Sequence, residues 1–262
     1  MIDRLLSIPQ RFFSLLGVKR CLFCRLPIEK ERELCKECET ALAVERLWEC
    51  GACGSVLSEC ECSSAYLAKN GVRRLIKLYR YRPDTKSRLN LLLYRLKRHR
   101  QEGVRAFLSR ELLPSVRRVV DGSDGFVITY VPRTARARRR HGFDQSEDLS
   151  QALGERLSIP VKTLIRRTDT ARKQKELHSL SERIRHAKST FLPVEGISLK
   201  GKRLLLVDDT VTTGASLIAC AYVLRKMGAR EVIAVSPFVS FRHKGVRPTA
   251  DKTLRPARLS KK

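Results

Sequence analysis

Two adjacent aspartates, Asp208 and Asp209, end an apolar run and precede a turn rich in threonine and glycine. Neighbouring carboxylates are costly to place together unless they accept hydrogen bonds or lie near a cation. The turn offers hydroxyls and free backbone N–H groups at the start of a helix, where the helix dipole favours an anion. The loop thus combines acceptors for sugar hydroxyls with donors for a phosphate, which predicts a sugar phosphate as ligand. The residues of the turn are Thr212, Thr213, Gly214, Ala215 and Ser216.

This order of apolar strand, two acids, two further residues and phosphate loop resembles the phosphoribosyl pyrophosphate motif of the type I phosphoribosyltransferases. The resemblance implies that Asp208 and Asp209 hold the ribose 2′- and 3′-hydroxyls, and that Thr212 to Ser216 hold the 5′-phosphate. It also implies Mg²⁺ that bridges the ribose hydroxyls and the pyrophosphate. Thr210 departs from the motif, in which an aliphatic residue is usual.

A second loop follows the apolar run that ends at Val131, and it contains five arginines in residues 133 to 140. The segment from Val131 to Gln145 resembles a block of the ComF family of competence proteins, with His141 in place of an arginine and Asp144 in place of an asparagine. The resemblance extends over roughly residues 21 to 240 and includes cysteine pairs ahead of the domain.

The resemblance to these families implies that the loop after Val131 binds pyrophosphate, with Arg133 and Arg136 neutralising its charge. The polar stretch from Thr168 to Ser181 lies where a mobile hood would close over the ligand. The sequence does not allow a nucleophile or a general acid to be assigned. Three functions therefore stay open: a phosphoribosyltransferase acting on an unidentified nitrogen acceptor, a non-catalytic sensor of phosphoribosyl pyrophosphate, and a DNA-uptake factor of natural transformation. The third is compatible with either of the others.

Eight of the nine cysteines lie in the first quarter of the chain, mostly in pairs with the spacing of zinc knuckles. Two residues between thiolates direct both sulfurs at one ion, and four sulfurs close a tetrahedral site, so such a zinc is structural. Sequential pairing predicts two sites, while an interleaved pairing and a role as buried or redox thiols stay open. Cys220, in an apolar run, is predicted to be a core residue. The two sequential sets are Cys21, Cys24, Cys35 and Cys38, then Cys50, Cys53, Cys60 and Cys62.

The chain carries 54 Lys and Arg against 27 Asp and Glu, a formal net charge of +27. This excess predicts a polyanionic partner, and one sugar pyrophosphate accounts for only a few of the charges. Single-stranded DNA is the expected second partner, with a helicase or the DNA-uptake proteins as alternatives. In residues 71 to 100, basic side chains alternate with tyrosines, a composition that suits either single strands or a solvated helical face.

The N-terminus lacks the continuous apolar core of a signal peptide, and no run approaches the roughly 18 apolar residues of a membrane span. We therefore expect a cytoplasmic protein with reduced thiols. The amphipathic residues 1–20 are predicted either to lie on the inner face of the membrane or to pack against the protein's own core or a partner.

The elements that position the two loops are predicted as strands at 126–131, 203–207 and 231–239, alternating with helices at 144–157 and 215–227. This alternation indicates parallel βαβ units, whose ligands bind at the carboxyl ends of the strands. The expected fold is α/β: a type I phosphoribosyltransferase-like parallel sheet flanked by helices, preceded by a small zinc-binding module. The predicted segments are 1–20, an amphipathic stretch; 21–64, the zinc module; 65–117, a basic helical linker; 118–241, the phosphoribosyltransferase-like domain; and 242–262, a basic tail expected to be disordered.

Overall fold

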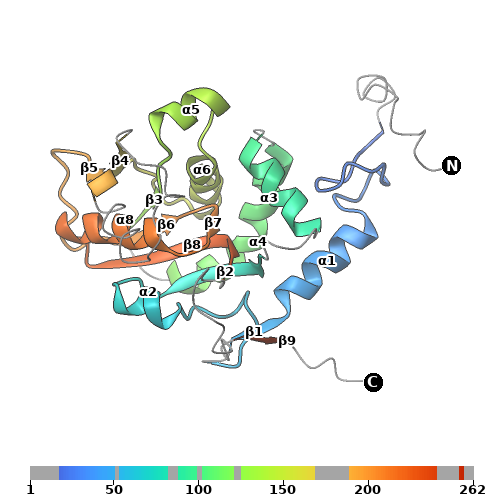
Figure 1. Cartoon of the computed structure of the whole chain (residues 1–262), viewed down its shortest axis with the longest axis horizontal. Helices are drawn as coiled ribbons and strands as arrows, with labels where there is room; N and C mark the ends of the chain where they lie inside the picture. The colour runs from blue at the N-terminus through green and yellow to red at the C-terminus, as the bar shows by residue number, and fades with distance from the viewer. Residues whose placement is uncertain are drawn as a thin grey trace.

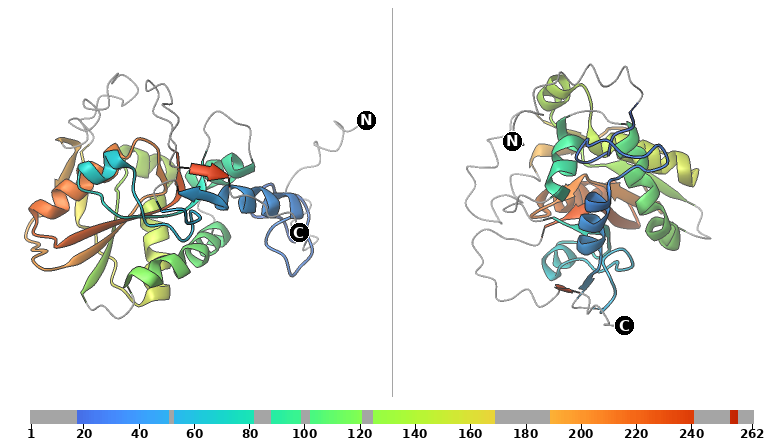
Figure 2. Two further views of the ribbon diagram at one scale, coloured as in Figure 1. Left: turned by 90° about the horizontal axis from the view of Figure 1, so that it is seen from below. Right: turned by 90° about the vertical axis from the view of Figure 1, so that its right-hand side faces the viewer.

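A computed structural model describes residues 18–50, 53–81, 88–98, 102–120, 125–168, 189–240 and 254–256. Its centre is a parallel sheet with helices on both faces, and a cysteine-rich module lies at one end (Figures 1 and 2). The strands are β1 Trp48–Cys50, β2 Leu75–Arg80, β3 Phe126–Tyr130, β4 Ile165–Arg167, β5 Phe191–Pro193, β6 Arg203–Val207, β7 Thr210–Val211, β8 Glu231–Val239 and β9 Leu254–Pro256. The helices are α1 Lys36–Arg46, α2 Ala65–Lys69, α3 Arg88–Arg98, α4 Glu102–Val120, α5 Ala135–His141, α6 Gln145–Leu157 and α8 Ala215–Lys226.

The central sheet has the strand order β2-β8-β6-β3, and all of these pairings are parallel. Strand β7 adds to β8 beyond the end of β6. The strands predicted at 126–131, 203–207 and 231–239 are confirmed as β3, β6 and β8, and the two predicted helices are confirmed as α6 and α8. The expected α/β fold is therefore present.

Side chains alternate between two apolar layers, one on each face of the sheet. In β6, Leu205 and Val207 belong to the layer formed with α4 and α6, whereas Leu204 and Leu206 belong to the layer under α8. Because both faces are covered, the strands are continuous apolar runs, as expected for a buried parallel sheet. Cys220 lies in the second layer with no exposed surface, which confirms that it is a core residue.

Strand β2 corrects the sequence-based prediction of a helical linker over residues 65–117. It pairs in parallel with β8, from Leu75 opposite Ala234 to Arg80 opposite Val239, and all but its last residue are buried. Lys77 interrupts the apolar run of this strand, and that charge concealed the strand from pattern reading. The rest of the range does contain helices, and the four leucines predicted to face inward from α3 are buried: Leu89, Leu92, Leu93 and Leu96.

The cysteine-rich module packs directly on the helices beside the sheet. Phe23 meets the Phe107 ring of α4 edge-on, with 5.5 Å between ring centroids. Glu33 forms an ion pair with Arg110 of the same helix, at 2.5 Å. Cys21, Phe23 and Cys38 share one apolar cluster with α3 and α4, so the module and the sheet have a continuous core.

Several predicted segments lie wholly or mostly outside the described residues. They are the amphipathic stretch 1–20, of which 18–20 are described, nearly all of the expected hood at 168–181, and most of the tail at 242–262. Of the tail, Leu254–Pro256 form β9, antiparallel to β1. None of the helices in the described part of the chain has both the length and the apolar character needed to cross a bilayer.

Candidate functional site

The carboxyl ends of β3 and β6 lie side by side, and they bring together the two loops that the sequence singles out. Tyr130 is opposite Val207 in the parallel register, and the Val131 N–H donates to the Val207 carbonyl at 2.9 Å. The arginine-containing loop and the aspartate loop therefore begin at neighbouring positions. In parallel α/β sheets this edge is where ligands bind.

Asp144 closes the first loop on itself. Its Oδ2 accepts the Arg133 N–H at 2.7 Å, while Oδ1 accepts the N–H of Ser146 at 3.1 Å and of Glu147 at 3.5 Å as the N-cap of α6. Burial raises the pKa of the Asp144 carboxyl, and the three backbone donors oppose that rise. The position that carries asparagine in the ComF pattern thus fixes the loop after β3 through backbone contacts.

Ser146 joins the two loops. Its hydroxyl donates to Asp208 Oδ1 at 3.4 Å and accepts the Asp209 N–H at 3.2 Å, and Asp208 Oδ1 accepts the same N–H at 3.0 Å. Sequence reasoning missed this serine, because a serine in the first turn of a helix carries no specific signal. Its position depends on the contact between α6 and β6.

The two aspartates have different surroundings. Asp208 is 9% exposed, and its Oδ1 is held by the protein itself. Asp209 is partly exposed, and within the described residues its carboxylate has no hydrogen-bonding or ionic partner. Asp209 is therefore the carboxylate available to an incoming molecule, while Asp208 also has a structural role.

The residues between the aspartates and the phosphate loop form β7. Thr210 pairs with Phe238 and Val211 with Val239 of β8, and the Ser240 N–H donates to the Val211 carbonyl at 2.7 Å. The Thr210 hydroxyl oxygen is buried and has no hydrogen-bond partner within the described part of the chain. Thr210, which departs from the usual aliphatic residue, therefore has a buried hydroxyl that no described residue compensates with a hydrogen bond.

The predicted phosphate loop contains Gly214, whose backbone conformation disfavours a residue with a side chain. Gly214 has φ +73°, and a Cβ there would lie 2.3 Å from Cδ2 of Leu67, a buried residue of α2. Helix α8 starts immediately afterwards, with the Ile218 N–H donating to the Gly214 carbonyl at 2.9 Å. The N–H groups of Ser216 and Leu217 precede that first intrahelical bond, so they face outward at the positive end of the helix.

The arginines after β3 are not equivalent. Arg133 has its backbone held by Asp144, and its Nη1 is buried with no hydrogen-bond partner among the described residues. Arg138 forms an ion pair with Glu147, whose carboxylate also accepts the Tyr130 hydroxyl at 2.9 Å. Arg136 is exposed on α5, a helix without buried residues. Arg133 thus has a buried guanidinium nitrogen at the strand end that no described residue satisfies.

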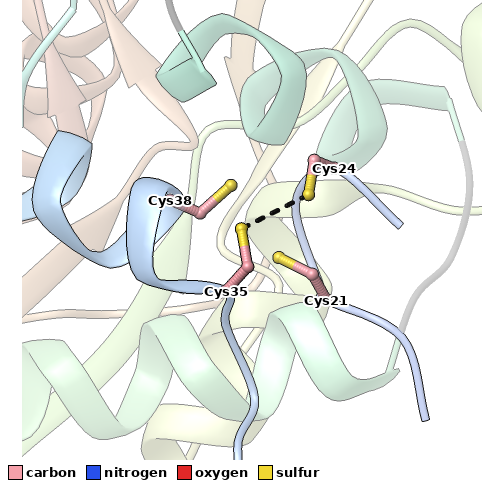
Figure 3. A group of neighbouring side chains, drawn as sticks. All are labelled: Cys21, Cys24, Cys35 and Cys38. Atoms are coloured by element: carbon pink, nitrogen blue, oxygen red, sulfur yellow. Dashed lines mark hydrogen bonds between the residues drawn. The ribbon is translucent and has the colours of Figure 1, made fainter. Parts of the chain in front are cut away.

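The eight N-terminal cysteines form two clusters with the sequential pairing. Within each cluster the sulfur atoms all lie within 4.8 Å of one another. A zinc–sulfur bond of about 2.3 Å in a tetrahedron separates sulfurs by about 3.8 Å, so each cluster fits one ion. Figure 3 shows the first cluster, in which two cysteines of the N-terminal loop face two from the start of α1; the Cys24 and Cys35 sulfurs are 3.6 Å apart.

Local hydrogen bonding helps some of these thiols to ionise. Burial opposes ionisation of Cys21, but N–H groups of Cys24, Cys35 and Phe23 outweigh it and lower the Cys21 pKa to about 7. The Ser55 N–H does the same for Cys53, whose pKa also falls to about 7. Thiolates are the form that binds a metal, so the surroundings of Cys21 and Cys53 favour metal binding, whereas burial raises the pKa of Cys35 and Cys62.

A buried lysine of β2 lies against the second cluster, and sequence reasoning missed it. Lys77 is 1% exposed, and its Nζ contacts Cys60 Sγ at 3.2 Å and the carbonyls of Cys62 at 2.7 Å and Cys60 at 3.3 Å. Burial raises the pKa of the Cys60 thiol to about 12, and the Lys77 charge opposes that rise. The only sequence signal was a lysine inside an apolar strand-like run.

The chain is similar in sequence to a known domain family and to named bacterial proteins. Residues 140–254 match the family described as phosphoribosyl transferase domain. The chain is 31% identical over 225 residues to the DNA utilization protein YhgH of Salmonella typhimurium, covering 81% of this chain and 93% of that protein. It is 29% identical over 222 residues to competence protein F of Haemophilus influenzae, with the same coverage. A solved hypoxanthine phosphoribosyltransferase of Staphylococcus aureus has 13% identity and a TM-score of 0.35, over 52% of this chain and 62% of that one.

The parallel sheet, its order of elements and the matched domain define a protein of the type I phosphoribosyltransferase-like class. Within that class, two features point to one family: the similarity to YhgH and competence protein F over most of the chain, and the two cysteine clusters ahead of the domain. The chain belongs to the ComF family.

Replacing Gly214 with alanine should destabilise the protein by about 2 kcal/mol, because the substitution adds strain at positive φ to a collision with buried Leu67. Gly201→Ala is the matched control: it has a similar φ of +76° with nothing within 4 Å of a Cβ, so only the backbone term applies. Urea unfolding of both variants measures the difference, and equal losses of stability would show that Leu67 does not restrict the loop.

Thr210→Val should raise the free energy of unfolding by about 1 kcal/mol, because it removes a buried hydroxyl without a partner and keeps the side-chain shape. Thr163→Val provides the contrast, since the Thr163 hydroxyl is 2.8 Å from the Tyr130 hydroxyl and its loss should destabilise. A loss of stability in Thr210→Val as large as in Thr163→Val, measured by the same unfolding assay, would mean that the Thr210 hydroxyl has a partner.

Proposed function

We propose that the carboxyl edge of the sheet binds phosphoribosyl pyrophosphate with Mg²⁺. The proposal is carried by three groups at adjacent strand ends: the Arg133 guanidinium, the available Asp209 carboxylate and the amino end of α8. The Nη1 of Arg133 has no hydrogen-bond partner among the described residues. Phosphoribosyl pyrophosphate would use all three groups, because its ribose hydroxyls lie between a 5′-phosphate and a pyrophosphate. The combination of one cation, one acceptor and one set of N–H donors supports this ligand class.

Each group has a defined part in the proposed complex. Asp208 and Asp209 accept the ribose 2′- and 3′-hydroxyls, and the loop of Thr212 to Ser216 donates to the 5′-phosphate. Arg133 and Arg136 neutralise the pyrophosphate. The carboxylates of Asp208 and Asp209 are oxygen ligands of the kind that Mg²⁺ prefers, and bound Mg²⁺ would supply further positive charge for the pyrophosphate.

We further propose that the protein acts in DNA uptake during natural transformation. Its relatives are named for DNA utilization and competence, and its net charge of +27 far exceeds what one sugar pyrophosphate needs. Direct contact with single-stranded DNA is the simplest use of that charge, and docking on a helicase or the uptake proteins is the alternative. In this role the protein has two alternatives. It either transfers the ribosyl group to a nitrogen nucleophile or senses the ligand without turnover.

We also propose that both cysteine clusters hold structural zinc. Lys77 supports this for the second cluster, because a buried ammonium is costly unless a negative charge compensates it. Four thiolates around one zinc ion carry net negative charge, which provides that compensation. Four sulfur ligands leave no open coordination position, so the metal stabilises the module and takes no part in chemistry.

The purified chain should therefore contain two zinc ions, and Lys77→Met should lose one of them when challenged with a chelator. The reason is that the second cluster then lacks its counter-charge, while the first has no contact with Lys77 among the described residues. Elemental analysis gives the metal content, and Cys24→Ser serves as the converse control that loses the first ion only. Less than one zinc per chain would overturn both sites, and two retained ions in Lys77→Met would overturn the role of the lysine.

Asp209→Asn should weaken binding of phosphoribosyl pyrophosphate with Mg²⁺ by roughly 10- to 100-fold, the value of hydrogen bonds to a charged acceptor. Stability without ligand should stay unchanged, because the carboxylate makes no contact within the described residues. Thermal shift measures both quantities, since a ligand of the native state raises the melting temperature by mass action. Glu155→Gln, an exposed charge change on α6, is the control, and affinity unchanged from wild type in Asp209→Asn would remove the assignment.

Measuring pyrophosphate release distinguishes a transferase from a non-catalytic sensor. Release in the presence of a nitrogen base or nucleotide supports a transferase, and binding without release across the screen supports a sensor. The double variant Asp208→Asn with Asp209→Asn should abolish binding in either case, whereas retained binding would contradict the site itself.

A further inference from the structure

A second basic site lies at the opposite edge of the sheet, where β2, β8 and β6 begin. A cavity of about 450 Å³ is present there, lined by four arginines and one acid. Since these strands are parallel, their first residues lie at the edge away from the Asp208 loop. The charged residues of the lining are Arg73, Arg74, Arg225, Arg230 and Glu231.

The acid in the lining is already neutralised. Glu231 pairs with Arg74 at 3.2 Å and with Arg203 at 3.0 Å, and Arg74 also pairs with Glu61 at 2.6 Å. These ion pairs account for Arg74 and fix one wall of the cavity. Arg225 is held by its donation to the Gly71 carbonyl at 2.7 Å.

Arg73 and Arg230 have no such partner. Both are exposed, and neither forms an ion pair or a side-chain hydrogen bond within the described residues. A helix C-terminus attracts cations, and the end of α8 accounts for Arg225 in this way. It does not account for Arg73, which precedes β2, or for Arg230, which follows the helix. Two guanidinium groups are therefore left for an anion from outside.

The backbone beside Arg230 extends this positive surface. The Arg230 N–H donates to the Lys202 carbonyl at 2.9 Å, and the backbones of Lys200 and Ala229 form an isolated antiparallel β-bridge. The side chains of Lys200 and Lys202 are exposed. Exposed cations in the chain segment next to the cavity fit an extended polyanion better than a single small phosphate.

The second cysteine cluster supports the other side of the cavity. The backbones of Cys62 and Arg74 form an isolated antiparallel β-bridge, and the Ser63 hydroxyl donates to the Arg73 carbonyl at 3.1 Å. Glu61, which holds Arg74, lies between the ligand cysteines Cys60 and Cys62. The position of Arg73 thus depends on the same segment that forms the cluster.

We propose that this cavity and its basic rim bind the phosphate groups of single-stranded DNA, with Arg73 and Arg230 as the principal contacts. The guanidinium group presents paired N–H donors that match phosphate oxygens. This inference rests on the proposed role in DNA handling, and it places the DNA contact on the edge opposite the sugar-pyrophosphate site. Both ligands can then be bound at once.

The test is fluorescence anisotropy with a labelled oligothymidylate, titrated at several salt concentrations. Arg73→Gln with Arg230→Gln should weaken binding about tenfold and reduce the slope of log K against log salt by about 1.4, at roughly 0.7 per lost phosphate contact on a single strand. Arg117→Gln with Lys162→Gln removes two exposed charges elsewhere and should leave the slope unchanged. The charge-preserving pair Arg73→Lys with Arg230→Lys should restore the slope.

The outcomes distinguish failure of the proposed cavity site from failure of direct DNA binding as such. If the wild type fails to bind the oligonucleotide at low salt, direct DNA contact itself is overturned. If the wild type binds and the glutamine pair behaves like the control pair, the cavity is not the DNA contact. If the glutamine pair loses affinity for inorganic triphosphate but keeps its affinity for the oligonucleotide, the cavity is a site for a small polyphosphate and the DNA assignment is wrong. Unchanged thermal shift with phosphoribosyl pyrophosphate in the glutamine pair supports two separate sites.

Discussion

The parallel pairing of β3 with β6 is the constraint on which the candidate site depends. It starts two loops, more than sixty residues apart in the chain, from neighbouring positions, and Ser146 and Asp144 then tie those loops to each other and to α6. The pairing is enforced by apolar layers on both faces, because a one-residue slip would send each buried leucine to the wrong layer. The loop chemistry is therefore held in place by the core beneath it.

The cysteine-rich module is part of the same structural unit. The first cluster shares its apolar core with α3 and α4, and the second contacts β2 through Lys77. A metal ion in the second cluster would therefore act on an edge strand of the central sheet and would not merely close a peripheral knuckle. This explains how a lysine can occupy the interior of a buried strand: its carbon chain packs in the core, and its ammonium reaches the sulfur cluster.

Basic side chains of the described residues lie at both edges of the sheet. At the carboxyl edge, Arg138 pairs with Glu147, and the Nη1 of Arg133 has no hydrogen-bond partner among the described residues. At the amino edge, Arg73 and Arg230 lack acidic partners among the described residues, and exposed lysines continue the surface. In the proposed complexes, a small phosphorylated ligand and an extended polyanion would therefore use different cations.

The sequence alone determined the features whose signals are contiguous. Strand, aspartates, glycine turn and helix follow one another within residues 203–226, and the cysteine spacing is local, so both were predicted correctly as local structure. Tertiary structure decided what depends on distant residues: strand β2, disguised by Lys77, the unequal surroundings of Asp208 and Asp209, and the cavity where Arg74 meets Glu231 across 157 positions of the chain. The physical reason is that hydrogen bonds and burial assign a polar side chain its role, and both depend on neighbours that only the folded chain brings together.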